Sequence, residues 1–185
     1  MEVLFHLIFE IVKIAILACI YSTLLLIAYR MISHSTFSTS NNKSFGHGFR
    51  FWLVIAFIIS LGFFFFMFTY YGDHGLGDSS RIPIGYFKDV KQIDGYQTYI
   101  ENQQGKQLDI QKFTVNNNKL YAQLTNDNTG KYFYAIWNLK TDKWTLYRTE
   151  KDYLLAQNVP LPGTFKDFDK HYTQYWNGWR FWLLP

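Results

Sequence analysis

Three residues with metal-binding side chains lie close together in the glycine-rich segment Tyr70–Pro83. Asp73, His74 and Asp78 offer two carboxylates and an imidazole, groups that bind divalent cations in many proteins. The three glycines of the same segment indicate a backbone held in tight or left-handed turns. Because the spacing matches no known metal motif, two interpretations stand: a cation site, or a structural stalk, which we favour.

Ionisable side chains form a second pattern near the N-terminus, where His6, Glu10 and Lys13 follow one another at helical spacing. Residues at i, i+4 and i+7 lie on one stripe of a helix. Inside a membrane span, such a stripe often forms a proton or ion path. This one lies at the end of its apolar segment, where charged side chains reach water. We therefore favour an interfacial turn or a face for a partner protein, with Glu10 paired to Lys13.

The string GDS at residues 77–79 also occurs in GDS esterases, but the rest of the chain argues against a hydrolase. Such an enzyme needs a catalytic histidine and oxyanion donors on an α/β sheet. His171 is the only histidine after His74, and its spacing from Asp169 does not fit. The sequence therefore predicts no enzyme, no catalytic residue and no cofactor.

There is no charged residue between Phe51 and Phe68, and we expect the apolar segment that contains them to cross a membrane as a helix over residues 51–71. The hydrocarbon core of a bilayer requires about 20 apolar residues of a spanning helix. Arg50 closes one end of the segment, and Tyr70 and Tyr71 close the other. Such residues anchor spanning helices at the two membrane interfaces.

An earlier apolar segment, Val3–Tyr29, predicts another span over about residues 5–29. As a helix it would reach about 40 Å, which exceeds the thickness of the hydrocarbon core. Part of this segment must therefore tilt or lie outside the membrane.

The loop between the two spans, residues 31–49, contains no acidic residue, and Arg30, Lys43 and Arg50 make it positive. The positive-inside rule places such a loop in the cytoplasm. The N-terminus and the large C-terminal part are then periplasmic. Lys13 is the residue that works against this orientation.

Residues 72–85 are predicted to form the stalk loop, and residues 86–185 a small β-rich domain. Short runs rich in aromatic and β-branched residues alternate here with turn signals, which is typical of an antiparallel meander. The predicted strands are 96–101, 108–115, 119–124, 131–139 and 143–148.

Two helices are expected to cover this sheet. Thr149 caps the first, which Pro160 ends, and Thr164 caps the second, Phe165–Trp176. The predicted fold is thus a two-helix transmembrane hairpin followed by a small antiparallel sheet with one or two covering helices.

Aromatic residues crowd the C-terminal end, among them Trp176, Trp179 and Trp182. Such side chains gain much from burial, so this end is not expected to be a disordered tail. One destination is the open face of the sheet, and the other is the membrane interface, where Arg180 would sit at headgroup depth. We favour the sheet, because Gly178 ends the preceding helix and would return the chain across the domain.

Composition excludes some partners. The 185 residues carry a formal charge of +4, but from Gly72 onward there are 14 Lys and Arg against 12 Asp and Glu. Nucleic acid requires a clustered excess of basic residues and is therefore excluded as a partner. The only cysteine, Cys19, excludes an intrachain disulfide and is expected to be a small buried apolar side chain.

Two strings, GDHGLGDSSRIPI at residues 72–84 and YWNGWRFWLLP at residues 175–185, resemble segments of small two-helix membrane proteins of the Bacteroidota group of bacteria. That family carries no assigned activity, and the resemblance implies a diderm cell envelope. We expect a non-catalytic inner-membrane subunit or accessory protein of a larger envelope complex. Its partners would be the lipid bilayer and other membrane-protein subunits. The alternative is a membrane-anchored sensor of a small ligand or cation.

Overall fold

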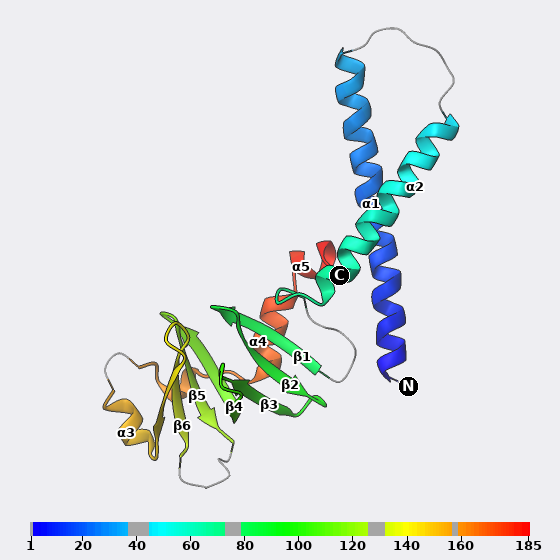
Figure 1. Ribbon diagram of the computed structural model, residues 1–185. Helices are drawn as coiled ribbons and strands as arrows, with labels where there is room; N and C mark the ends of the chain where they lie inside the picture. The colour runs from blue at the N-terminus through cyan, green and yellow to red at the C-terminus, as the bar shows by residue number, and fades with distance from the viewer. Residues whose placement is uncertain (1, 37–44, 73–78, 126–131, 157–158) are drawn as a thin grey trace. The chain divides into compact units, whose positions relative to one another are not determined.

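The computed structural model describes residues 2–36, 45–72, 79–125, 132–156 and 159–185. The chain divides into two compact units. The helical unit comprises Met1–Leu76 together with Trp179–Pro185, and the sheet unit comprises Gly77–Gly178. Figure 1 shows the elements of each unit.

Two long apolar helices, α1 (Glu2–Thr36) and α2 (Phe45–Met67), form the core of the helical unit. Their stretches Leu7–Ile32 and Gly48–Met67 are long and apolar enough to span a membrane. The prediction of two such helices is confirmed. The predicted end at Tyr71 was wrong, because the chain turns after Met67, with the Thr69 hydroxyl donating to the Phe66 carbonyl at 2.7 Å.

The packing stripe of α1 is built from small and medium side chains. Ile14, Leu17, Ala18 and Ser22 are buried, and their spacing places them on one face of the helix. Small residues at such positions let two apolar helices approach closely. Cys19 lies beside this stripe but is exposed, so the prediction that it is buried was wrong.

The sheet unit contains seven antiparallel strands arranged in chain order. This order is the meander that the turn signals predict. The strands are β1 (Ser79–Gly85), β2 (Lys88–Ile93), β3 (Gln97–Glu101), β4 (Gln107–Asn116), β5 (Lys119–Leu124), β6 (Tyr134–Asn138) and β7 (Lys143–Tyr147).

The first two strands were not predicted. Ser79–Gly85 was assigned to the stalk loop, but it is β1 and pairs with β2 from Ser79 opposite Ile93. Pro83 is tolerated in β1 because β1 is an edge strand, and the pairing with β2 shifts register between Pro83 and Gly85. The sheet unit therefore begins earlier than residue 86.

The long strand β4 joins the two halves of the sheet. Its residues 107–109 pair with β3, whereas Ile110–Asn116 pair with β5, and the register shifts between Ile110 and Lys112. Such an irregularity increases the bend and twist of a strand. The buried core draws apolar residues from both halves, including Val90 and Ile100 from one and Leu120 and Trp137 from the other.

Two helices cover the sheet, as predicted. Helix α3 (Glu150–Leu154) begins after the Thr149 cap, and its Tyr153 packs with Tyr121 and Tyr134. Helix α4 (Phe168–Trp176) places Phe168 in the main core.

The predicted start of the second helix was wrong. Its cap is Asp167, whose side chain accepts from the Lys170 amide, whereas Thr164 ends a short 3-10 turn, η1 (Pro162–Thr164). A carboxylate is a strong N-cap and competes well with a threonine nearby. A last short helix, α5 (Trp179–Leu183), belongs to the helical unit.

Candidate functional site

The predicted cation ligands Asp73, His74 and Asp78 lie outside the described residues. Within the ranges that the structure describes, no three His, Cys, Asp or Glu residues gather into a group that fits a metal ion. The cation site therefore stays a prediction from sequence.

The predicted charged stripe lies on the N-terminal part of α1. The side chain of His6 is outside the description, and Glu10 and Lys13 are each partly exposed. Lys13 Nζ lies 4.9 Å from the centre of the Phe181 ring, a cation–π contact with α5. One oxygen of Glu10, Oε2, is buried and has no hydrogen-bond partner among the described residues.

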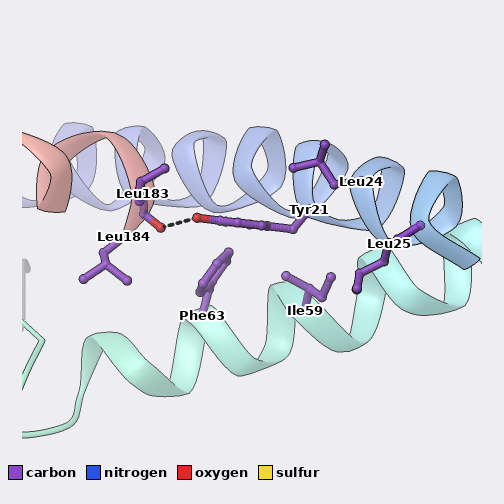
Figure 2. A pocket seen from close by; sticks show the side chains of 8 residues that line it. Tyr21, Leu24, Leu25, Ile59, Phe63, Leu183 and Leu184 are labelled. Carbon is purple, nitrogen blue, oxygen red and sulfur yellow. Dashed lines mark hydrogen bonds between the residues drawn. The ribbon is translucent and has the colours of Figure 1, made fainter.

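The C-terminal segment packs against α1 and α2. The Tyr21 hydroxyl donates to the Leu183 carbonyl at 3.1 Å, and the Tyr21 ring also contacts Phe63, with ring centres 5.6 Å apart. Figure 2 shows these side chains around an apolar groove of about 530 Å³. Its lining residues are Tyr21, Leu24, Leu25, Ala28, Ile59, Phe63, Leu183 and Leu184.

The expectation that the whole C-terminal aromatic cluster covers the sheet was wrong for its last part. Trp176 does contact the sheet, since its Nε1 donates to the Arg81 carbonyl of β1 at 3.2 Å. Trp179 and Trp182 belong to the helical unit and are 58% and 73% exposed. The change of direction occurs at Gly178, whose φ of +80° only glycine adopts without strain.

The other predicted interface anchors lie near the ends of the two long helices. Arg30 and Arg50 are exposed and lie within α1 and α2, because both helices extend into the predicted loop 31–49: α1 continues to Thr36 and α2 begins at Phe45. Tyr70 and Tyr71 follow the other end of α2, and their rings meet edge to face with centres 5.1 Å apart. This arrangement is compatible with anchoring at two interfaces.

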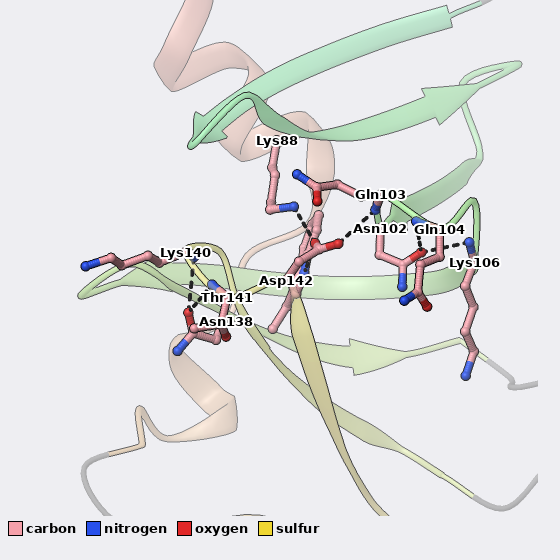
Figure 3. Close-up of polar contacts among 10 residues, drawn as sticks. Lys88, Asn102, Gln103, Gln104, Lys106, Asn138, Lys140, Thr141 and Asp142 are labelled. Atoms are coloured by element: carbon pink, nitrogen blue, oxygen red, sulfur yellow. Dashed lines mark hydrogen bonds and ion pairs between the residues drawn. The ribbon is translucent and has the colours of Figure 1, made fainter.

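Asp142 connects several polar groups of the sheet unit and lies in the turn between β6 and β7 with a φ of +59°. It forms an ion pair with Lys88, at the start of β2. Its Oδ1 also accepts from Trp137 Nε1 at 3.1 Å, and its Oδ2 accepts from the Gln103 amide at 2.9 Å. Figure 3 shows Asp142 between these groups.

The ion pair is shielded from solvent, with Lys88 only 6% exposed and Asp142 16% exposed. Burial raises the pKa of Asp142, but hydrogen bonds from Lys88, the Gln103 amide and the Trp137 indole outweigh it and hold the pKa below its ordinary value. The carboxylate is thus ionised, and both of its oxygens accept hydrogen bonds. It joins the first half of the sheet to the second, which is a structural role.

Side-chain oxygens that accept from backbone amides also stabilise the neighbouring turns. Asn102 Oδ1 accepts from the amides of Gln104 and Lys106, and Asn138 Oδ1 accepts from those of Lys140 and Thr141. Asparagine side chains that bond to nearby amides stabilise tight turns. The turns at the end of the sheet unit around Asp142 are therefore stabilised by side-chain hydrogen bonds.

His171, the one histidine considered for catalysis, is also structural. It stacks on the Phe113 ring with centres 4.1 Å apart, and its Nε2 lies 2.8 Å from the Phe113 carbonyl. Because a carbonyl only accepts, Nε2 carries the proton and donates it. Burial lowers the pKa of His171, and this hydrogen bond opposes the shift.

Comparison of the chain with protein-family models, with curated proteins and with solved structures finds no match. The proposed function therefore rests on the chemistry of the described residues.

Sequence reasoning missed the pairing of Lys88 with Asp142. The turn at 140–142 was recognised, but a partner 54 residues away leaves no local pattern. It also missed the attachment of α5 to α1, because the aromatic residues of α5 suit an apolar helix as well as a sheet.

Proposed function

We propose that the chain is an integral inner-membrane protein that carries its sheet unit on the periplasmic side and acts as a non-catalytic subunit or accessory protein of a larger envelope complex. The observation that carries the proposal is the surface of α1 and α2. The large apolar side chains exposed on these helices, such as Leu24, Phe57 and Phe65, range from 38% to 72% in their exposure. A water-exposed surface of this kind is rare, whereas lipid or a partner protein would cover it.

The sheet unit supports a role in protein contact. Large apolar side chains are exposed on its turns and just after α3, with Phe87 at 83%, Tyr96 at 79% and Leu155 at 76%. Exposed aromatic and aliphatic side chains on a rigid scaffold are the usual anchors of protein interfaces. The polar clusters at Asp142 and His171 are internally bonded, which suits a scaffold better than a catalyst.

The orientation rests on charge. Arg30 lies in the last two turns of α1 and Arg50 in the first two turns of α2, and Lys43 stands between the two helices in the sequence. Positive residues in such places favour the cytoplasmic side. The sheet unit follows α2 and would emerge on the opposite side.

Two experiments on the tagged full-length protein test the proposal. Alkaline carbonate should leave the protein in the membrane pellet, since integral proteins resist it. Purification in a mild detergent should then yield an assembly with fixed stoichiometry, measured by native mass spectrometry. Release by carbonate would contradict the membrane anchor, and a monomer that binds no other subunit would contradict the subunit role and leave the sensor as the better hypothesis.

A further inference from the structure

The short helix α5 packs on both long helices of its own unit. The Tyr21 hydroxyl of α1 donates to the Leu183 carbonyl at 3.1 Å, and Lys13 Nζ lies 4.9 Å from the centre of the Phe181 ring. Tyr21 also contacts Phe63, which lies about one turn before the end of α2. Helix α5 is therefore level with the last turns of α2, and Figure 1 shows it beside that end of the helix.

This level corresponds to one edge of the length that can span a membrane. The apolar stretch of α2, Gly48–Met67, has 20 residues and measures about 30 Å, which is the thickness of the hydrocarbon core. The apolar stretch of α1, Leu7–Ile32, is longer, and the same length counted back from Ile32 reaches Lys13. On this count both helices leave the hydrocarbon within about two turns of α5.

The side chains of α5 are those that favour a membrane interface. Its four large apolar side chains are between 46% and 73% exposed, and the helix contains no acidic residue. The guanidinium of Arg180 lies 4.9 Å from the centre of the Trp179 ring. Tryptophan combines an apolar ring with a polar N–H group, and both it and arginine are enriched where hydrocarbon meets headgroups. The four apolar residues are Trp179, Phe181, Trp182 and Leu183.

The exposed surface of α5 is continuous with that of the two spans. Leu183 and Leu184 line the apolar groove of Figure 2 together with Leu24, Leu25 and Ile59, which lie within the two apolar stretches. No charged side chain lines this groove. Lipid that surrounds the two spans therefore also reaches α5.

We propose that α5 is an interfacial helix, whose exposed aromatic side chains lie between the headgroups and the upper hydrocarbon of the bilayer that α1 and α2 span. The inference rests on the proposed function, and it assigns lipid as the partner of the C-terminal segment. An interfacial helix places its apolar side chains about 5–10 Å into the boundary between headgroups and acyl chains. Both covalent connections of the sheet unit then lead to the bilayer.

Spin-label depth measurements test the position of α5. The full chain, with Cys19 first replaced by serine, is reconstituted into vesicles of phosphatidylethanolamine and phosphatidylglycerol. A label at Trp182→Cys reports on α5, and Trp182 is 73% exposed, so its replacement removes few contacts. Labels at Phe57→Cys, in the middle of α2 and 65% exposed, and at Lys140→Cys, exposed on the sheet unit, give the references for hydrocarbon and water.

Accessibility to oxygen, which concentrates in hydrocarbon, and to a nickel chelate, which stays in water, gives the depth of each label. We expect the label at position 182 to lie within about 10 Å below the phosphates, between the two references. A label at Trp179→Cys, at the other end of α5, should lie closer to water, because the chain enters the helical unit there. Accessibility at both positions equal to that of the water reference, or shielding of both from the two reagents by protein, would overturn the proposal.

The reference position separates this inference from the proposed function. If the label at position 57 lies in hydrocarbon but the labels on α5 do not reach the interface, the interfacial helix is wrong and the membrane anchor stands. If the label at position 57 is as accessible to the nickel chelate as the water reference, both are wrong.

Discussion

At the scale of single residues, the ion pair of Lys88 with Asp142 is expected to contribute strongly to stability. Asp142→Asn keeps the preference for a positive φ but removes the charge that compensates a lysine only 6% exposed. We expect the free energy of unfolding to fall by about 3 kcal/mol, at the low end for one partner lost from a buried pair, because the amide still accepts one hydrogen bond. Urea unfolding of the full chain in detergent, followed by tryptophan fluorescence, measures the loss.

Asp94→Asn is the matched control. Asp94 also has a positive φ, of 54°, in a turn, but it is exposed. Its replacement should change the free energy of unfolding by less than about 0.5 kcal/mol. Equal effects of the two substitutions would show that the Lys88 pair contributes nothing specific.

The same ion pair predicts that the stability of the fold depends on pH in the acidic range. The pKa of Asp142 is lowered in the folded state from an ordinary value of 3.8. Its contribution to stability is therefore complete above pH 3.8 and is lost as the pH falls through the folded-state pKa. Urea titrations at several acidic pH values should show this loss in the native protein and a shallower one in Asp142→Asn.

His171 predicts a change of stability at milder pH. Its pKa is lowered in the folded state from an ordinary value of 6.5, so the folded protein resists protonation more than the unfolded chain does. Stability should fall as the pH drops below about 6.5 toward the folded-state pKa. His171→Gln, compared by thermal unfolding at pH 7.5 and pH 5.5, should reduce this difference, and a difference as large as in the native protein would assign it to other groups.

The residues that the sequence suggested as functional differ from those that form long-range hydrogen bonds in the structure. His171 and Asp142 appeared in the sequence as a rejected catalyst and as a turn residue, and their partners Phe113 and Lys88 lie 58 and 54 residues away. Hydrogen bonds over such separations depend on how strands and helices pack in the folded unit, and no local sequence pattern encodes that packing.

At the scale of elements, the attachment of α5 gives a test of the division into units. Ending the chain at Gly178 removes the contacts of Phe181 with Lys13 and of Leu183 with Tyr21. Hydrogen exchange should then accelerate in α1 around Tyr21, while the amides of β5 and β6 keep their protection within about tenfold. A collapse of protection across the sheet would show that the tail stabilises the sheet after all.

The elements that were predicted have strong local signals. The charge-free run of α2 and the turn signals on both sides of β5 needed no tertiary information. β1 was missed because Gly77, Asp78 and Pro83 are turn formers, and an edge position in the sheet is what allows Pro83 in a strand. The cap of α4 was misplaced because Thr164 and Asp167 are both good caps.

At the scale of the whole molecule, the orientation across the membrane has a direct test. A cysteine at Ser40, which lies outside the described residues, should be shielded from an impermeant thiol reagent in intact spheroplasts, whereas one at Asn117 should react. The exposed Cys19 is first replaced by serine to remove its background. Reversed labelling would contradict the orientation derived from Arg30, Lys43 and Arg50.

The order of the units along the chain has a further consequence. The chain leaves the helical unit, forms the whole sheet unit and returns to the helical unit at Trp179. The sheet unit is thus an insertion with two covalent connections to the helical unit. A protease that cuts one loop within residues 77–178 would leave both fragments attached, so release of this domain into the surrounding compartment requires two cuts.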